Sequence, residues 1–337
     1  MILYRWRGAV RNFGDELNTL LWPKLLPDFF DDDPAVRFLG VGSILDRRHD
    51  GGGLKLVAGS GYGGYEALPR LDRSWIIHWV RGPRTAVRLG LPETLGFGDP
   101  ASLLEQAGLT LPRTVRDIGF MPHFESAAHG AWAAAAALAG VTLIDPRDDP
   151  TAVIAAMSRC RLLISEAMHG IVVADSLRIP WIAIQPLAPI HRAKWWDWAD
   201  TLRLRIQFRR LPPSSAMEWA SASALASCHT GRLLLRRHDS RLRDWRAEAF
   251  LDRAADALRR TAGHAAQLSD ERALGVCQAR MLERVEGVRR QPYRGLRSSR
   301  LPDRSEDTCV FVTIPRTYPM ISPVQSLSGG PLLSRLP

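Results

Sequence analysis

Residues 162–184, with the sequence LLISEAMHGIVVADSLRIPWIAI, indicate the fold class of the whole chain. The apolar run at 162–165 predicts a buried strand, residues 170–177 predict a helix, and the apolar run at 181–184 predicts a second strand. A strand, a helix and a strand in succession are typical of a parallel sheet that is covered by helices. His169 lies between the first strand and the helix, at the sheet edge where open α/β proteins bind ligands.

The same alternation of apolar runs and helical stretches continues on the N-terminal side of this unit and just beyond it. Further strands are predicted at residues 1–4, 36–41, 54–58, 75–80, 95–97, 114–120 and 141–144. Further helices are predicted from a loop at 12–18 through residue 26, and at 81–89, 101–106, 150–159 and 193–204. We therefore expect an α/β protein with one lobe at 1–112 and a second lobe at 113–210.

The last third of the chain has a different composition. Residues 211–223 are rich in Pro, Ser and Ala and predict a linker, while residues 241–288 have helical spacing with arginines opposite the apolar face. We expect a linker and helical extension at 211–290, and a disordered basic tail at 291–337 because that segment lacks periodicity. The stretch 241–288 is compatible with peripheral contact to anionic lipid at the inner membrane face, or with packing over the two lobes.

The composition narrows the class of partner. A length of 337 residues allows two domains with sizeable cores, and the net charge of +10 favours anionic partners such as phosphorylated substrates or membrane surfaces. The sequence has no basic stripe interleaved with aromatic residues and no nucleic-acid-binding motif, so we expect no nucleic acid partner.

The cysteines and histidines give no sign of a metal site. The four cysteines lie far apart without a CxxC pair, and His123, His169 and His191 are scattered, so we expect no metal. Widely spaced cysteines fit a reduced compartment, and the sequence contains neither a signal-peptide core nor an apolar run long enough to span a membrane. These features predict a cytoplasmic protein.

His169 is the first candidate catalytic residue. A histidine changes charge near neutral pH, as a general acid or base must, and Glu166, three residues earlier, could orient or charge its imidazole. The alternative is structural: His169 would only cap the helix while Met168 packs in the core.

Two further segments suit an anionic ligand. Arg81 and Arg84 flank a Gly-Pro pair at a strand end, where guanidinium groups and a helix N-terminus could bind a phosphate or carboxylate. Asn12, Gly14 and Asp15 precede a helix and suit an anion or a sugar hydroxyl. The alternatives are a surface arginine pair and an ordinary Asn cap.

Other candidates lie at the ends of predicted strands. Gly42 and Ser43 belong to a glycine-rich loop that does not fit a P-loop, because no Gly-Lys-Ser/Thr follows. Asp99, in a Gly-Asp-Pro turn, could place a carboxylate in the cleft, although Asp-Pro also commonly starts a turn. His123 could point into the cleft between the lobes, or could be a structural histidine.

Taken in order, the segments NFGDELN (12–18), GVGSI (40–44), VRGPRT (80–85), GDP (98–100) and ISEAMHG (164–170) resemble the polysaccharide pyruvyltransferase family, especially its ketal-forming exopolysaccharide members. The resemblance covers residues 1–210. It implies two Rossmann-like lobes arranged as in GT-B glycosyltransferases, with phosphoenolpyruvate as donor and His169 and Arg81 in the donor site. Many members have an arginine two residues before this histidine, where this chain has Ala167, so we expect Arg81 and Arg84 to bind the phosphate.

The resemblance also implies a mechanism. Protonated His169 would act as the acid or phosphate partner while the methylene of phosphoenolpyruvate is protonated, and arginines would stabilise its carboxylate and the departing phosphate. Asp15 or Asp99 would accept the proton of the attacking sugar hydroxyl. No metal or redox cofactor is required, and the expected acceptor is a lipid-linked oligosaccharide or polysaccharide.

Two other functions fit the same predicted fold. A GT-B glycosyltransferase would use a nucleotide-sugar donor, and a non-catalytic module would bind a sugar or phosphate without turnover. The melting temperature measured with phosphoenolpyruvate and with nucleotide-sugars distinguishes a pyruvyltransferase from a glycosyltransferase, because a bound donor stabilises the folded state.

Overall fold

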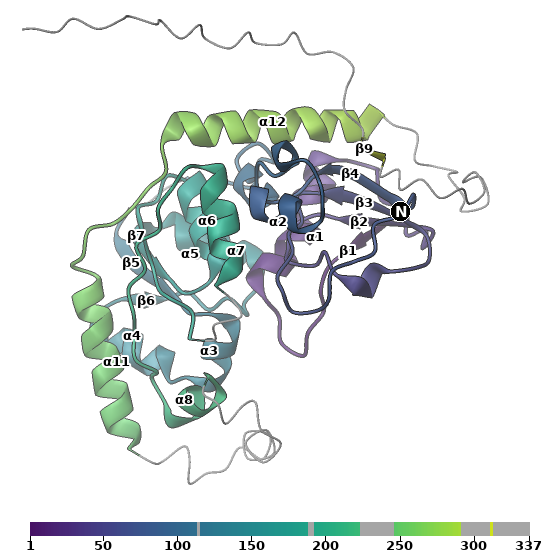
Figure 1. Ribbon diagram of the computed structural model, residues 1–337. Helices are drawn as coiled ribbons and strands as arrows, with labels where there is room; N and C mark the ends of the chain where they lie inside the picture. Colours follow the sequence, from purple (N-terminus) through teal and green to yellow (C-terminus); the bar gives the residue numbers. More distant parts are fainter. Residues whose placement is uncertain (113–114, 188–191, 223–245, 291–310, 313–337) are drawn as a thin grey trace, which may run out of the picture.

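The computed structural model describes residues 1–112, 115–187, 192–222, 246–290 and 311–312 (Figure 1). Two parallel sheets, each covered by helices, make up the two lobes. The predicted α/β class with parallel sheets is therefore confirmed.

The first sheet contains the four N-terminal strands β1 (Ile2–Tyr4), β2 (Val36–Leu39), β3 (Leu54–Ala58) and β4 (Trp75–Trp79). They pair side by side in sequence order, all parallel. Every residue of β3 is buried, and four of its five residues are apolar, as expected for a strand inside a covered parallel sheet. The exception is Lys55, whose Nζ donates to Oγ of Ser74 at 2.9 Å. A two-residue strand, β9 (Phe311–Val312), pairs parallel with the outer edge of β4.

The second sheet has the order β6-β5-β7-β8. Its strands are β5 (Asp117–Met121), β6 (Thr142–Leu143), β7 (Cys160–Ser165) and β8 (Trp181–Ala183), again all parallel. Helix α6 (Met168–Ser176) connects β7 to β8, as residues 162–184 predicted. The strand–helix–strand unit at the centre of this sheet is therefore confirmed.

Helices cover both sheets and connect their strands. In the first lobe they are α1 (Phe13–Leu25) and α2 (Pro83–Arg88), with 3₁₀ turns η1 (Arg47–His49), η2 (Glu93–Leu95) and η3 (Pro100–Leu103). In the second lobe they are α3 (Phe124–His129), α4 (Trp132–Ala139), α5 (Pro150–Ser158), α6, α7 (Ala193–Thr201) and α8 (Ala216–Ala222). The C-terminal helices are α11 (Ala247–Thr261) and α12 (Glu271–Arg290).

Two short predicted elements differ from the structure. The strand predicted at 95–97 is the end of η2 followed by a single bridge between Val80 and Gly96, and the helix predicted at 101–106 is the shorter turn η3. The side chain of Asp99 accepts from the N–H of Ala101 and so starts η3 one residue before a proline, which sets φ for that turn. Segments of three or four residues are too short for apolar periodicity to distinguish a strand or an α-helix from a 3₁₀ turn.

The predicted linker at 211–223 contains a helix, α8. Glu218 holds this helix in place: its carboxylate accepts from the indole N–H of Trp132 at 2.7 Å and from the backbone N–H of Ser214 at 2.6 Å. Burial, and then the charge of Glu166, raise the pKa of the Glu218 carboxyl to about 7. The Pro/Ser/Ala composition of this segment gave no sign of a buried acid that anchors a helix.

The predicted helical extension consists of two helices, each of which packs on a different lobe. Helix α11 packs on α4 of the second lobe, and α12 lies across the first lobe against β4 and η3 (Figure 1). Between them the chain is extended, because Gln267 pairs with Trp181 at the edge of β8. Of the tail at 291–337 predicted to be disordered, only β9 falls in the described residues, and it is a strand; the rest lies outside them.

The two lobes share one apolar core. A continuous cluster of buried side chains runs from Leu17 and Leu21 of α1 to Ile171 and Val172 of α6, and on to Met281 of α12. Each large apolar side chain buried in this way stabilises the fold by about 1.5–3 kcal/mol before entropy is counted. The lobes are therefore held together firmly enough to position a site that draws on both. None of the helices in the described part of the chain is long and apolar enough to cross a membrane.

Candidate functional site

The carboxyl ends of strands from both sheets face a common cavity of about 330 Å³. Six residues predicted from the sequence line it: Asn12, Asp15, Gly42, Ser43, His123 and His169. Seven further residues complete the lining: Trp6, Ile44, Arg48, Tyr65, Phe124, Glu125 and Lys194. Segments that are far apart in the sequence thus meet at the place where open α/β folds bind ligands.

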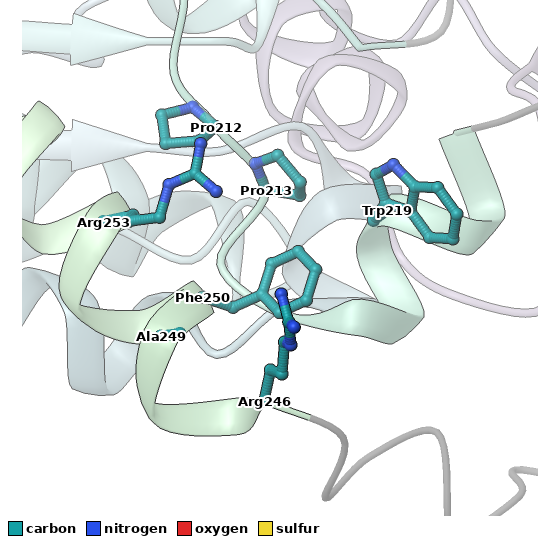
Figure 2. Close-up of a pocket in the computed structure, with 7 residues that line it drawn as sticks. All are labelled: Pro212, Pro213, Trp219, Arg246, Ala249, Phe250 and Arg253. Atoms are coloured by element: carbon teal, nitrogen blue, oxygen red, sulfur yellow. The ribbon is translucent and has the colours of Figure 1, made fainter.

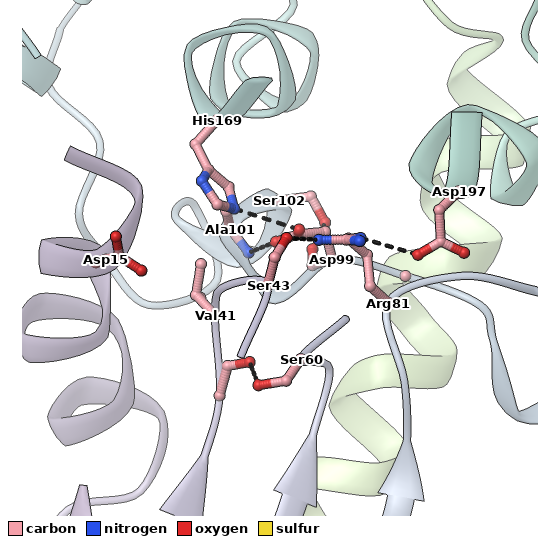
Figure 3. Close-up of polar contacts among 12 residues, drawn as sticks. Asp15, Val41, Ser43, Ser60, Arg81, Asp99, Ala101, Ser102, His169 and Asp197 are labelled. Atoms are coloured by element: carbon pink, nitrogen blue, oxygen red, sulfur yellow. Dashed lines mark hydrogen bonds and ion pairs between the residues drawn. The ribbon is translucent and has the colours of Figure 1, made fainter. Parts of the chain in front are cut away.

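His169 lies in the first turn of α6, which begins one residue earlier, at Met168. Its Nε2 is 3.4 Å from Oδ2 of Asp99, and neither of these two atoms has another hydrogen-bond partner in the described part of the chain (Figure 3). That separation is longer than an ordinary hydrogen bond, and the contact is an ion pair when the imidazole is protonated. Met168 is buried, as the structural alternative predicted, but His169 also faces the cavity.

Asp99 lies behind the imidazole and away from the cavity. Only 1% of the residue is exposed, and its Oδ1 accepts from the N–H of Ala101 at 3.0 Å. Burial alone would raise the pKa of this carboxyl, but the charge of His169, with a smaller contribution from Arg81, lowers the pKa below its usual value. Asp99 is therefore a buried carboxylate whose charge faces the imidazole of His169.

Gly14, in the first turn of α1, makes room for the imidazole. A Cβ built on Gly14 would lie 1.9 Å from Nδ1 of His169, closer than any real contact. Only glycine lets α1 approach the ring this closely. Gly14 was predicted to contact a ligand; in the structure its missing side chain leaves space for Nδ1 of His169.

Asp15 follows Gly14 and does face the cavity. Burial raises the pKa of its carboxyl; the charge of His169, a 2.6 Å hydrogen bond from Asn12 and the charge of Lys194 offset only part of that rise. A carboxylate with a raised pKa holds a proton more readily near neutral pH, as a general base must. Of the two aspartates predicted to accept a proton, Asp15 is the one that lines the cavity.

Asn18, one turn further along α1, fixes the loop that follows β2. Its amide Nδ2 donates to the backbone oxygens of Asp15 and Val41, and its Oδ1 accepts from the N–H of Val41 at 2.8 Å. The indole of Trp22 donates to the same oxygen. This buried network sets the position of Gly42 and Ser43 relative to the start of α1. Sequence reasoning did not single out Asn18.

Arg81 is fully buried at the end of β4 and its guanidinium bonds three groups of the protein. It donates to Oδ2 of Asp197 at 3.0 Å, to Oγ of Ser43 at 2.6 Å and to the carbonyl of Tyr62 at 3.2 Å (Figure 3). Ser43 in turn lines the cavity. In this structure Arg81 therefore acts on the cavity through Ser43 and through its charge near Asp99, and its direct contact with a donor stays a prediction.

Arg84 lies outside this cavity. Its Nε donates to Oδ2 of Asp200 at 2.7 Å, and both side chains are largely exposed. For Arg84 the structure therefore shows the alternative named above, a surface arginine that bonds a nearby carboxylate. Arg81 and Arg84 thus both pair with acids of α7, Asp197 and Asp200.

Glu166 has a different contact from the one predicted. The carboxylate beside His169 is that of Asp99, whereas the oxygens of Glu166 accept from the backbone N–H groups of His123 and Leu187. Glu166 thereby connects the loop that follows β5 to the loop that follows β8. His123 lines the cavity, and its Nδ1 lies 3.5 Å from Glu125.

Two cations that line the cavity were not predicted. Arg48, in η1, donates from Nε to Oδ1 of Asp46 at 2.7 Å, and Lys194, in the first turn of α7, lies close enough for its charge to act on Asp15. Lys194 is one of only three lysines in a chain whose basic residues are otherwise arginines, and this was the available signal. No signal in the sequence marks Arg48.

A second cavity, of about 320 Å³, lies between α8 and α11 (Figure 2). Its lining consists of Pro212, Pro213, Trp219, Arg246, Ala249, Phe250 and Arg253. It contains neither a carboxylate nor a histidine, and no residue predicted for the site lines it. This second cavity therefore lacks the groups that general acid–base chemistry needs, whereas the cavity of His169 has both histidines and carboxylates. Among the described residues, no group of three His, Cys, Asp or Glu side chains is placed to hold a metal ion.

Comparison with known proteins gives these residues a context. The sequence model of a family described as polysaccharide pyruvyl transferase matches residues 70–186, a range that includes Arg81, Asp99 and His169. The chain is 39% identical over 227 residues to the succinoglycan biosynthesis protein ExoV of Rhizobium meliloti (strain 1021), covering 64% of this chain and 69% of that protein. No solved structure matches the chain.

Proposed function

The chain belongs to the polysaccharide pyruvyl transferase family, and from this premise we propose that it transfers pyruvate from phosphoenolpyruvate to a sugar of a bacterial exopolysaccharide. The acceptor in this proposal is a lipid-linked repeat unit, and the product is a cyclic pyruvate ketal with release of phosphate. The observation that carries the proposal is the buried Asp99 carboxylate behind His169 at the wall of a cavity with cations. We infer a GT-B-like arrangement of the lobes, which is supported by site residues at the carboxyl ends of both parallel sheets.

The reaction balances without an oxidant or reductant. One proton adds to the methylene carbon of phosphoenolpyruvate, which becomes a methyl group and leaves an oxocarbenium-like carbon. One sugar hydroxyl attacks that carbon, the C–O bond to phosphate breaks, and a neighbouring hydroxyl closes the ring. The two hydroxyls lose two protons, of which one replaces the proton consumed and one leaves with the phosphate.

His169 is the proposed acid for the first step. With Nε2 held by Asp99, the nitrogen that can pass a proton to a ligand is Nδ1. In this proposal the buried carboxylate of Asp99 lies opposite the positive charge that His169 carries as an acid. Close approach of Gly14 fixes the ring plane.

The remaining charges of the cavity suit the rest of the reaction. The cations Arg48 and Lys194 are placed to attract the carboxylate and phosphate of phosphoenolpyruvate, which replaces the predicted direct use of Arg84. Asp15, with its raised pKa, is the proposed acceptor of the attacking hydroxyl's proton. Arg81 positions Ser43 and adds positive potential beside Asp99.

The test is turnover with defined substrates. Purified protein is incubated with phosphoenolpyruvate and candidate lipid-linked oligosaccharides, and phosphate release is measured together with a gain in acceptor mass of one pyruvate less one water. We expect both signals from the wild type and neither from His169→Gln at more than about one hundredth of the rate. Equal rates for the two proteins would remove His169 from catalysis.

A donor comparison separates this function from nucleotide-sugar transfer. Phosphoenolpyruvate should raise the melting temperature of the protein in a concentration-dependent way, because a ligand at one hundred times its Kd stabilises by about 2.7 kcal/mol. Stabilisation by a nucleotide-sugar but not by phosphoenolpyruvate would instead support the glycosyltransferase reading.

A further inference from the structure

A third cavity, of about 610 Å³, adjoins the candidate site. Two short segments form the wall between the two cavities. Gly64 lines this cavity whereas its neighbour Tyr65 lines the site of His169, and Ala193 lines this cavity whereas Lys194 lines that site. Consecutive Cα atoms are about 3.8 Å apart, so a ligand that leaves the candidate site over this wall enters the third cavity directly.

An exposed tryptophan forms one side of this cavity. Trp196, on α7, is 37% exposed, although its neighbours Trp195 and Trp198 are buried. Phe208 contacts its ring edge-on, with the ring centres 5.8 Å apart, and so holds the indole in one orientation. A flat apolar face held at a polar cavity suits the C–H face of a sugar ring.

The polar groups of the cavity carry both signs of charge. Arg84 and Asp200 form their 2.7 Å ion pair at its edge, and its other charged lining residues are Arg88, Glu93 and Asp197. A sugar hydroxyl both donates and accepts hydrogen bonds, so it pairs with either sign. An anion would meet the carboxylates of Asp200 and Glu93, and the chemistry therefore favours a neutral saccharide over a second anionic donor.

The floor of the cavity is rigid and connected to the candidate site. The buried Asp197 accepts from the guanidinium of Arg81, from the N–H of Thr85 at 2.9 Å and from the Thr85 hydroxyl at 2.6 Å. That hydroxyl also accepts from the N–H of Tyr62 at 3.1 Å, and Arg81 reaches Ser43 in the candidate site. Because α2, α7 and the loop at 62–64 are fixed to one another, the cavity needs no rearrangement before a ligand binds.

We propose that this third cavity binds the neutral sugars of the acceptor oligosaccharide next to the one that receives pyruvate, with Trp196 as the surface on which a sugar ring stacks. The assignment rests on the proposed function for the location of the reacting sugar. It makes Trp196 a specificity residue: the protein selects an oligosaccharide over a monosaccharide because only the longer acceptor reaches this cavity.

The first test is kinetic and uses the full chain with oligosaccharide acceptors of increasing length. Trp196→Ala should raise KM for the oligosaccharide about tenfold or more, leave KM for phosphoenolpyruvate within about twofold, and abolish the preference for long acceptors, because it removes the surface on which the sugar ring stacks. Trp196→Phe should restore most of the affinity. Trp219→Ala is the matched control, because Trp219 is a similarly exposed tryptophan in the cavity between α8 and α11.

The second test measures binding without turnover. Saturation-transfer NMR is recorded with a panel of neutral gluco- and galacto-tetrasaccharides and their monosaccharides, in the absence of phosphoenolpyruvate. We expect a tetrasaccharide to bind more tightly than any monosaccharide, and expect Trp196→Ala, but not Trp219→Ala, to weaken it. Binding that is equal in wild type and Trp196→Ala, equally reduced by Trp219→Ala, or absent for every tetrasaccharide overturns the assignment.

The two proposals fail in distinguishable ways. Saccharide binding that depends on Trp196 in a protein that does not turn over phosphoenolpyruvate would refute pyruvyl transfer and keep the sugar site. Turnover of phosphoenolpyruvate with acceptor kinetics that are unchanged in Trp196→Ala would keep pyruvyl transfer and refute the sugar site.

Discussion

Replacement of Asp99 by asparagine removes the charge behind His169 and keeps the shape of the side chain. Asp99 and His169 are 3.4 Å apart, and at an effective dielectric constant of about 20 the attraction between unit charges at this distance is about 5 kcal/mol. The asparagine amide retains part of this interaction as a dipole. We expect about 2–3 kcal/mol to be lost from the transition state, which lowers kcat about 30- to 150-fold.

The assay is phosphate release at saturating phosphoenolpyruvate and acceptor. KM for phosphoenolpyruvate should change little, because Asp99 does not line the cavity. Asp175→Asn is the matched control: Asp175 is equally buried, but it accepts from the indole of Trp181 and from Ser269 rather than facing His169, so kcat should stay within about threefold. A kcat for Asp99→Asn that equals the wild type would refute the role of the charge pair.

The same variant has a signature in stability. The pKa of Asp99 is lower in the folded protein than its unfolded value of 3.8, so its contribution to stability is complete above pH 3.8 and is lost as pH falls through the folded pKa. Denaturant unfolding should therefore show Asp99→Asn less stable than the wild type at neutral pH, and the difference should shrink at the acid end.

Three further predictions concern the surroundings of the site. Gly14→Ala should lower kcat at least tenfold and lower the free energy of unfolding by about 1–3 kcal/mol, because its Cβ displaces His169 from Asp99; a wild-type kcat would contradict the close approach. Glu218→Gln should be more stable than wild type at pH 8 but not at pH 5 in urea unfolding. The folded pKa of about 7 exceeds the unfolded 4.5, so the wild-type free energy of unfolding falls by up to about 3 kcal/mol as pH rises from 4.5 to 7 and changes little above 7; parallel pH profiles would refute this. Arg81→Met should cost about 3–5 kcal/mol of unfolding free energy by leaving Asp197 buried without its partner, and Asp197→Asn added to it should recover part of the loss; additive losses would contradict the pairing.

Much of the fold could be predicted because apolar periodicity marks buried strands. The strands around residues 36–39, 54–58, 75–79 and 160–165 were expected within one or two residues, since each is an apolar run between turn residues. Short 3₁₀ turns such as η2 and η3 could not be predicted, because their form depends on single hydrogen bonds and prolines. The break between α11 and α12 follows from the pairing of Gln267 with β8, a long-range contact that local spacing does not contain.

The site could be predicted from one rule, that parallel sheets bind ligands at the carboxyl ends of their strands. This rule correctly placed His169, Asp15 and Ser43 at one cavity. It could not say which carboxylate meets His169, because Glu166 is near in sequence but Asp99 is near in space. The direction in which each side chain points depends on the packed structure.

The contacts of the basic residues could not be predicted for the same reason. Arg81 was expected at the ligand because it ends a strand, but its guanidinium is directed toward α7, an element more than one hundred residues later in the chain. Arg48 was overlooked since η1 has no periodic pattern, and Lys194 was placed on a predicted helix whose cavity-facing side could not be known. The charges that line the cavity are therefore a result of the tertiary fold.

The most direct test of the central claim is transfer carried out in D₂O, with mass spectrometry of the ketal methyl group. If a protein acid beside this cavity protonates the methylene of phosphoenolpyruvate, the wild type places one deuterium in the methyl group of each ketal formed. His169→Gln should form this labelled product at no more than about one hundredth of the wild-type rate. A ketal without deuterium, or unchanged labelling rates in His169→Gln, would contradict the account.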